Sequence, residues 1–278
     1  MPIFEAIILG LIQGLTEFIP ISSSGHLVLV RELFGWEDTG IAFDTVLHLG
    51  TLLAVIIYFW STWKSLLFTL GRLIARKETK PENKFLLLAL IIGTLPALAI
   101  GYFFNESIDQ LFRDISWVAI FLIATGVLFV IAERARRWFK KREEQYGQKK
   151  FKDLGIGRAL FIGCMQAVAL LPGVSRSGLT IAGGIFSGLT REAAARFAFM
   201  LSVPIILAAG ILGLIEMAGN GGIAEIGLAS VIIGFIVAAA SGYLAIKFML
   251  RFLRQRKLYI FSIYLMILGV TLLVLGNL

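Results

Sequence analysis

Two stretches of the chain place ionisable, hydroxyl and glycine residues inside otherwise apolar sequence. The first runs from Gly10 to Leu27 (GLIQGLTEFIPISSSGHL) and the second from Gly163 to Thr180 (GCMQAVALLPGVSRSGLT). They align without a gap at an offset of 153 residues. The residues that recur at this offset are Ala6, Gly10, Gln13, Ser22, Ser24 and Gly25, which correspond to Ala159, Gly163, Gln166, Ser175, Ser177 and Gly178. Because polar groups in apolar surroundings are costly unless they are paired or used, we interpret the two stretches as the functional site.

Each stretch has a proline break, then a serine-rich turn with a glycine, and then a second apolar segment. The turns are Ser22–Gly25 and Ser175–Gly178. The free N–H groups at the start of a helix attract anions, and phosphate above all, while serine hydroxyls add further donors. The alternative is that the serines only cap the helices. Arg176 offers a planar fork that matches phosphate, and because an arginine at membrane depth costs roughly 2.5–3.5 kcal/mol, it needs a partner.

Glu17 is the other costly residue, and two interpretations of it remain open. It could form a structural ion pair with Arg176 across the two stretches. Alternatively, a carboxylate beside an anion site could bind a divalent cation, be protonated, or act as an acid–base group. Gln13 lies on the same helix face as Glu17, at a spacing of four residues, and its amide oxygen could position an ion or a water molecule.

His26 begins the helix after the first serine turn, where it could accept or donate a proton, although a lone histidine can also be a simple polar residue. Its counterpart in the second stretch is Leu179, so the predicted chemistry is asymmetric. The first stretch supplies Glu17 and His26, and the second supplies Arg176 and Thr180. We expect His48, in an apolar run, to serve packing or a local hydrogen bond.

The composition indicates a polytopic membrane protein. Of the 278 residues, 58% are apolar and 16% are charged, against about 25% charged in soluble domains. Several nearly uncharged runs have about the length that crosses a bilayer. The formal charge of +8 comes from basic residues between these runs, where the positive-inside rule accounts for them, so we exclude nucleic acid as a partner.

The apolar runs predict a re-entrant helix hairpin and three transmembrane helices in each half. In the first half the hairpin is Ile3–Phe34 and the spans are Thr45–Leu70, Phe85–Phe104 and Trp117–Ala132. In the second half the hairpin is Gly157–Leu189 and the spans are Arg191–Ile215, Gly227–Leu250 and Tyr259–Leu275. The basic segment Arg72–Lys84 is expected in the cytoplasm, and the segments Gly35–Asp44, Asn105–Ser116 and Glu216–Glu225 outside.

These elements predict a single, all-α integral-membrane domain over residues 1–278. Its repeats cover about 1–133 and 157–278, joined by a basic cytoplasmic loop at 134–156. Because three spans are an odd number, the second half enters the membrane from the opposite side. The prediction is therefore an inverted-topology repeat with both termini outside, in which the discontinuous helices form the site near the midplane.

The two motifs resemble those of the undecaprenyl-diphosphate phosphatase family, also called the bacitracin-resistance protein family BacA or UppP. The first has the form E/Q-x-x-x-E followed by a serine-rich turn that ends in Gly-His, and Gln13 and Glu17 match it. Many members have Glu where this chain has Gln13. The second motif has the form P-G-x-S-R-S-x-x-T. It is matched by Pro172, Gly173, Ser175, Arg176, Ser177 and Thr180.

The resemblance implies a phosphatase of the bacterial inner membrane that converts undecaprenyl diphosphate to the monophosphate carrier used in cell-wall synthesis. It implies dependence on a divalent cation, Mg²⁺ or Ca²⁺, with Glu17 engaging the metal or activating the nucleophile. Either Ser23 or His26 would attack or assist proton transfer. Arg176 and the turns would hold the diphosphate. The expected substrate-binding residues are Ser22, Ser24, Gly25, Gly173, Ser175, Ser177, Thr180 and Gln13.

A transporter or flippase for an anionic lipid or small anion is the alternative, because inverted repeats with broken helices are a transporter architecture. The acid–base pair Glu17 and His26 favours the phosphatase. The expected partners are a polyprenyl diphosphate and the lipid bilayer, with a homodimer left open. The resemblance favours a site that faces the outer side of the membrane.

Overall fold

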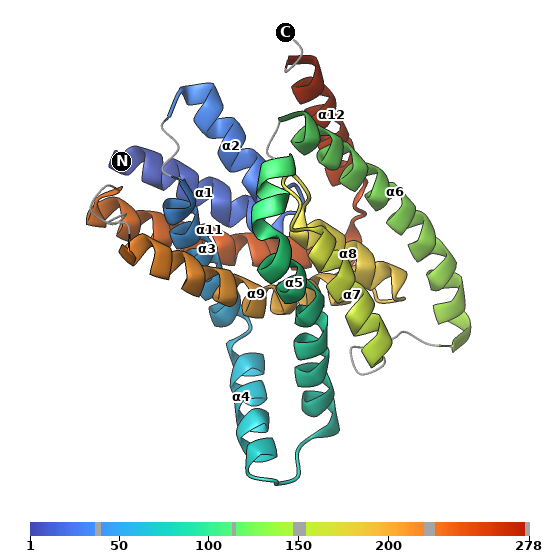
Figure 1. Ribbon diagram of the computed structural model, residues 1–278. Helices are drawn as coiled ribbons and strands as arrows, with labels where there is room; N and C mark the ends of the chain where they lie inside the picture. The colour runs from blue at the N-terminus through green and yellow to red at the C-terminus, as the bar shows by residue number, and fades with distance from the viewer. Residues whose placement is uncertain (37–39, 113–114, 147–153, 220–225, 276–278) are drawn as a thin grey trace.

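The computed structural model describes residues 1–36, 40–112, 115–146, 154–219 and 226–275, and within these ranges all regular secondary structure is α-helical (Figure 1). The first half of the chain contains α1 (Ile3–Phe18), α2 (Ser23–Phe34), α3 (Gly40–Tyr58), α4 (Trp60–Ile74), α5 (Pro81–Phe112) and α6 (Ile115–Tyr146). The second half contains α7 (Ile156–Val168), α8 (Arg176–Phe186), α9 (Arg191–Gly219), α11 (Leu228–Gln255) and α12 (Tyr259–Leu275). The predicted all-α fold is confirmed for these residues.

Both predicted broken helix pairs are present. The segment 19–22, which contains Pro20, separates α1 from α2, and the segment 169–175, which contains Pro172, separates α7 from α8. Proline cannot continue the helical hydrogen-bond ladder, which accounts for both breaks. In the second break Gly173 has a φ of +85°, and a Cβ there would lie 2.8 Å from the backbone of Val118. This turn therefore requires glycine.

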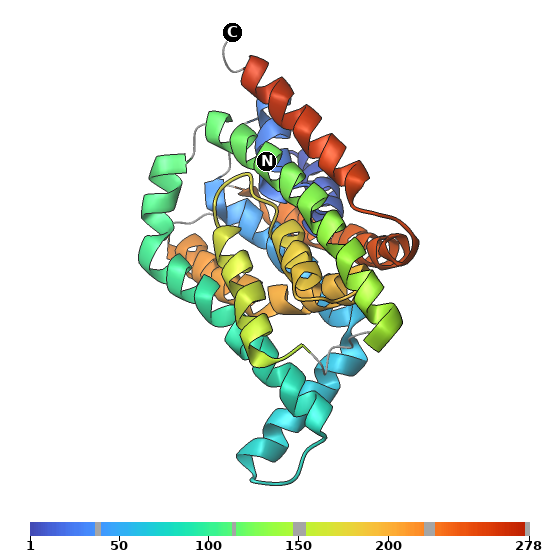
Figure 2. The ribbon, with the colours of Figure 1, turned by 90° about the vertical axis from the view of Figure 1, so that its right-hand side faces the viewer.

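The prediction of one long helix over Thr45–Leu70 is wrong. The helix breaks after Tyr58, and the directions of α3 and α4 differ by 85°. Phe59, between them, is non-helical at φ −101° and ψ 25°; its side chain is buried and its ring packs edge-on against Tyr58. After the bend, α4 extends away from the other helices, and the beginning of α5 runs back alongside it (Figures 1 and 2).

The boundaries of several predicted loops are also corrected. α6 continues to Tyr146, so the predicted loop 134–156 is helical over residues 134–146, because arginine, lysine and glutamate are good helix formers outside the membrane. In the same way, α3, α5 and α9 extend into the segments predicted as external loops. The parts of these loops at 37–39, 113–114, 147–153 and 220–225 lie outside the described residues.

The helices have the length and composition of a polytopic membrane protein. Among the described residues, four segments are long and apolar enough to cross a membrane: Pro81–Phe103, Ile115–Phe139, Arg191–Met217 and Leu228–Gln255. The bent pair α3–α4 would add a fifth if it is a single span. α12 is apolar but only 17 residues long. These segments are fewer than the six predicted spans.

The broken helices of each half pack against a long helix of the other half. α1 lies along α11, and α7 lies along α5 (Figures 1 and 2). A Cβ added at Gly10 would lie 2.9 Å from the carbonyl oxygen of Gly234, and one added at Gly163 would lie 2.3 Å from that of Gly93. Gly14 is similarly close to α11, at Ser241. Gly10 and Gly14 therefore allow the backbone of α11 to approach α1 closely.

Candidate active site

The two serine turns make the same capping hydrogen bond, although the N-cap φ is +70° in the first and −75° in the second. Ser22 is the N-cap of α2, and its Oγ accepts a hydrogen bond from the N–H of Gly25 at 3.4 Å. Ser175 is the N-cap of α8, and its Oγ accepts from the N–H of Gly178 at 3.1 Å. Capping is thus confirmed as one role of these serines. Each turn also presents the start of a helix, with its free N–H groups, to the space between the two hairpins.

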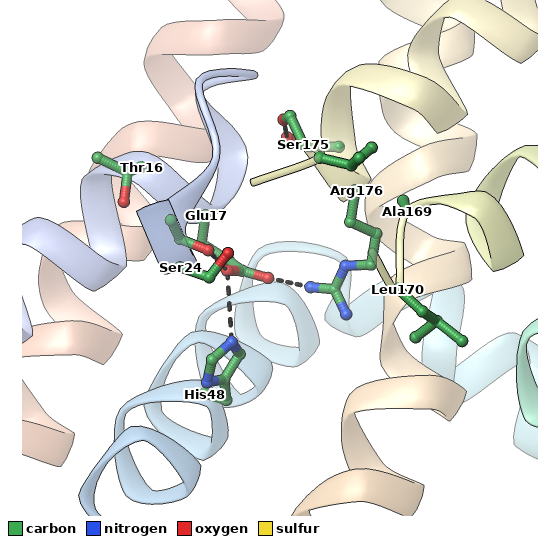
Figure 3. A pocket seen from close by; sticks show the side chains of 11 residues that line it. Thr16, Glu17, Ser24, His48, Ala169, Leu170, Ser175 and Arg176 are labelled. Carbon is green, nitrogen blue, oxygen red and sulfur yellow. Dashed lines mark hydrogen bonds and ion pairs between the residues drawn. The ribbon is translucent and has the colours of Figure 1, made fainter. Parts of the chain in front are cut away.

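A cavity of about 190 Å³ lies between the hairpins. Its wall is formed by the end of α1, the start of α2, α3, the connection between α7 and α8, and the start of α8. The lining residues are Thr16, Glu17, Ser23, Ser24, His48, Ala169, Leu170, Val174, Ser175, Arg176 and Ser177 (Figure 3). The predicted meeting of the two stretches is confirmed, because the stretches contribute every lining residue except His48.

Glu17 is the central side chain of this cavity. Its Oε2 accepts hydrogen bonds from Gln13 Nε2 at 2.9 Å and from Ser23 Oγ at 2.6 Å. Its Oε1 accepts from a guanidinium nitrogen of Arg176. The carboxylate is buried, whereas the Arg176 side chain is 20% exposed and reaches into the cavity from the other hairpin (Figure 3). The ion pair between Glu17 and Arg176, one of the two interpretations of Glu17, is present.

His48 is a site residue that the sequence did not predict. Its Nδ1 lies 2.7 Å from the carbonyl oxygen of Asp44, which confirms the expected local hydrogen bond. Its Nε2, however, lies 3.8 Å from Glu17 Oε2, on another side of the carboxylate from Arg176 (Figure 3). The only signal in the sequence was a single histidine in an apolar run, and nothing in that run pointed to Glu17.

His26 lies at the start of α2 but does not line the cavity. Its Nδ1 is 2.8 Å from the carbonyl oxygen of Ser22, and its Nε2 is 2.6 Å from the hydroxyl of Tyr264 on α12. The two rings are stacked, with their centroids 5.7 Å apart. Both ring nitrogens therefore have hydrogen-bond partners outside the cavity. These contacts hold the first serine turn in place.

The predicted substrate-binding residues divide into two groups. Ser24, Ser175 and Ser177 line the cavity. The others do not line it: Ser22, Gly25 and Gly173 lie at the turns, Thr180 lies in α8, and Gln13 lies in α1, where it donates to Glu17. The Thr180 hydroxyl, for example, donates to the carbonyl oxygen of Arg176 at 2.7 Å, within α8.

The donor set fits a divalent cation that binds together with a phosphate ligand. Among the described residues, no group of three or more His, Cys, Asp or Glu side chains could hold a metal ion by itself. Mg²⁺ commonly uses one or two carboxylates, substrate phosphate oxygens and water instead of a cage made only of protein groups. Glu17 supplies the carboxylate. Gln13 supplies a neutral oxygen, since its Oε1 is buried and has no hydrogen-bond partner among the described residues.

Together these groups can bind an anion and activate a hydroxyl beside it. Two helix N-termini and the Arg176 guanidinium favour a phosphate group in the cavity. The Ser23 hydroxyl donates to a carboxylate, which is the arrangement that a serine nucleophile needs to lose its proton. Phosphoryl transfer depends mainly on such positioning and charge stabilisation.

The comparisons with known proteins agree with this chemistry. The chain matches the model of the family described as bacitracin resistance protein BacA over residues 6–271. It is 38% identical to an undecaprenyl-diphosphatase of Halothermothrix orenii, over 100% of this chain and 99% of that protein. It is 42% identical to an undecaprenyl-diphosphatase of Carboxydothermus hydrogenoformans, over 98% of this chain and 97% of that protein. An undecaprenyl-diphosphatase of Thermobifida fusca is also 42% identical, over 99% of this chain and 90% of the relative.

Proposed function

The chain belongs to the bacitracin resistance protein BacA family, and from this premise we propose that it hydrolyses undecaprenyl diphosphate to undecaprenyl phosphate and inorganic phosphate. Family membership and the relatives favour this enzyme over the transporter or flippase. The observation that carries the assignment of the site is the Glu17 carboxylate, which holds Ser23 and Arg176 together in one cavity. The prenyl tail of the substrate would stay in the bilayer.

We propose Ser23 as the nucleophile, because it lines the cavity and His26 does not. Ser23 Oγ would attack the terminal phosphorus while Glu17 Oε2 accepts its proton. A bond forms between Oγ and the terminal phosphorus, and the bond from that phosphorus to the bridging oxygen breaks. The lipid monophosphate leaves with that oxygen. Water then attacks the phosphorus on Ser23, regenerates the hydroxyl and releases inorganic phosphate.

The other side chains hold the diphosphate and stabilise its charge. Arg176 would bind the oxygens of the terminal phosphate, with the N–H groups of Ser24 and Ser177 as further donors. Ser22, Ser175, Gly173 and Thr180 would maintain the turns that present these donors. A divalent cation, Mg²⁺ or Ca²⁺, would be held by Glu17 and the free oxygen of Gln13. When bound, it supplies charge neutralisation for the diphosphate.

We further propose that the two halves, 1–133 and 157–278, form an inverted-topology repeat within one membrane domain. The packing of the broken helices supports this. α1 of the first half packs on α11 of the second half, and α7 of the second half packs on α5 of the first half. The glycines at these two contacts support it too. Gly234 lies against α1 and Gly93 lies against α7, and each follows an Ile-Ile pair in the sequence. The proposal includes three crossings in each half, a site that faces the outer side of the bacterial inner membrane, and a homodimer as an open possibility for assembly.

The test of this function is phosphate release from undecaprenyl diphosphate by the purified protein in detergent. We expect release that stops when a chelator is added and returns with Mg²⁺ or Ca²⁺. Glu17→Ala and Ser23→Ala should each lower kcat by roughly 10³-fold, as expected for groups that act directly on the reacting atoms.

Matched controls separate chemistry from folding. Glu5→Ala removes another carboxylate from α1, and Ser202→Ala removes a buried hydroxyl from α9 that only bonds to its own helix, so both should retain activity. Thermal unfolding in detergent checks that each variant is folded. Normal turnover by folded Glu17→Ala would contradict the catalytic role. Failure of a folded wild-type protein to release phosphate would favour the transporter, for which flux of an anionic lipid in liposomes is the next measurement.

A further inference from the structure

Tyr264 contacts the first serine turn from the far end of the chain. It lies on α12, 238 residues after His26, and its hydroxyl is 2.6 Å from His26 Nε2. Its ring is stacked on the imidazole with an interplanar angle of 15°. Tyr264 does not line the cavity, and neither the sequence motifs nor the proposed chemistry use it.

The partners of His26 determine which ring nitrogen carries the proton. The atom opposite Nδ1 is the carbonyl oxygen of Ser22, at 2.8 Å, and a carbonyl oxygen can only accept a hydrogen bond. Nδ1 must therefore be the protonated nitrogen. In the neutral ring Nε2 is then an acceptor, so the hydroxyl of Tyr264 is the donor. Tyr264 thus stabilises the one neutral tautomer that can bond to Ser22.

Ser22 needs this support because its backbone is in an unfavourable conformation. Its φ is +70°, in the left-handed region that residues other than glycine rarely adopt. Such a conformation persists only where surrounding contacts hold it. The contacts here are the imidazole bond to the Ser22 carbonyl, the 3.3 Å bond from the His26 N–H to the same oxygen, and the Gly25 N–H bond to Ser22 Oγ.

The conformation of Ser22 sets the direction of the next residue, Ser23, whose hydroxyl must meet Glu17. We propose that Tyr264 is a positioning residue: it fixes the tautomer and ring of His26, which holds the Ser22 carbonyl and so orients Ser23 for attack. This inference rests on the proposed function, because it assigns Tyr264 a role in the same reaction. It also gives His26 a supporting role in the turn.

The first test is a double-mutant cycle on phosphate release. Tyr264→Phe removes only the hydroxyl and keeps the stacked ring, and we expect a roughly tenfold lower kcat with KM nearly unchanged, as for one lost hydrogen bond. Tyr243→Phe is the matched control: Tyr243 is on α11, and its ring packs against Tyr58. We expect wild-type kcat for this control.

The other side of the cycle is measured in the His26→Asn variant. The amide N–H₂ of this asparagine can donate to the Ser22 carbonyl without help from Tyr264. In this background we expect Tyr264→Phe to cause no further loss of kcat, because the effect of Tyr264 passes through His26. Independent effects, in which Tyr264→Phe costs the same tenfold with and without His26, would overturn the proposal.

A spectrum tests the tautomer directly. The chain contains only two histidines, His26 and His48, so untagged protein labelled with ¹⁵N-histidine gives few imidazole signals, and His26→Asn assigns those of His26. We expect His26 to be protonated at Nδ1 in the wild-type protein and to show a larger share of the Nε2-protonated form in Tyr264→Phe. An unchanged tautomer in Tyr264→Phe would overturn the proposal. The spectrum does not depend on turnover, so this failure is distinguishable from failure of the proposed function, which is absence of phosphate release by the wild-type protein.

Discussion

At the scale of single residues, Arg176 has two functions that one substitution can separate. Its guanidinium neutralises Glu17 and also offers a planar fork to the phosphate. Arg176→Lys keeps the charge and removes the fork, so we expect roughly a 10²-fold loss of kcat/KM, as for loss of a positioned donor to the transition state. The measurement is phosphate release at varied substrate concentration. Near-native kcat/KM would mean that Arg176 acts only as a point charge or as a structural partner of Glu17.

The sequence predicted some residues of the cavity and missed others for a physical reason. Glu17, Ser23 and Arg176 could be predicted because each stands out against apolar neighbours and lies in a stretch whose other residues, such as Gln13 and Ser22, recur at a fixed offset. His48 and Tyr264 are single polar residues in apolar helices. Their contacts with Glu17 and His26 depend on how α3 and α12 pack, and no local pattern encodes that packing.

At the scale of helices, glycines set how closely the broken helices approach their partners. A Cβ at Gly163 would meet the backbone of Gly93 at 2.3 Å, and backbone cannot move aside as a side chain can. We therefore expect Gly163→Ala to separate α7 from α5 and to destabilise the fold by about 1–3 kcal/mol. Gly157→Ala is the control in the same helix: this glycine has nothing within 4 Å, so the change should be neutral or stabilising by up to about 1 kcal/mol.

Thermal unfolding midpoints in detergent, with activity measured alongside, compare the two variants. Equal midpoints for Gly163→Ala and Gly157→Ala would contradict the argument that the contact between α7 and α5 requires glycine at position 163.

The positions of the helix breaks were predictable only where a proline in the sequence interrupts the helix. Pro20 and Pro172 interrupt both hairpins, and the sequence predicted both breaks. The break at Phe59 has no proline or glycine beside it. Phe59 is buried, and the neighbouring Tyr58 packs against Tyr243 of α11, so tertiary contacts hold the bend. Helix propensity alone is a weak guide where packing opposes it.

At the scale of the whole molecule, the buried carboxylate of Glu133 ties three parts of the fold together. Glu133 on α6 accepts from Arg191 Nε at 2.6 Å, at the start of α9, and from the N–H of Leu258 at 2.9 Å, between α11 and α12. Arg191→Ala leaves this carboxylate buried without its charged partner, with the N–H of Leu258 still bound to it. We expect the free energy of unfolding to fall by about 3 kcal/mol. This is the lower end of the range for a broken buried ion pair, because the Arg191 side chain is 21% exposed.

The control for this prediction is Arg254→Ala. Arg254 is exposed, and its partner Glu192 keeps a second bond to Arg196, so the unfolding midpoint should hardly change. If Arg191→Ala and Arg254→Ala have the same midpoint, Glu133 does not hold the three parts together.

The orientation of the molecule depends on whether the bent pair α3–α4 crosses the membrane. The basic turn between α4 and α5 lies at the bottom of both views, whereas the N-terminal end of α1 and the C-terminal end of α12 lie in the upper part (Figures 1 and 2). In a Cys164→Ala background, which removes the exposed native thiol, Glu32→Cys marks the end of α2 and Glu78→Cys marks the basic turn. We expect a membrane-impermeant maleimide to label Glu32→Cys on intact cells and Glu78→Cys only in inverted vesicles.

Opposite labelling of the two cysteines requires an odd number of crossings between them, which the bent pair alone can provide. With three crossings in each half, the second half then enters from the opposite face, and the two serine turns can meet from opposite sides of the bilayer. Labelling of both cysteines from the same side would make α3–α4 another re-entrant pair, and the inverted repeat would fail. Labelling with the two sides exchanged would reverse the molecule and turn the site toward the cytoplasm.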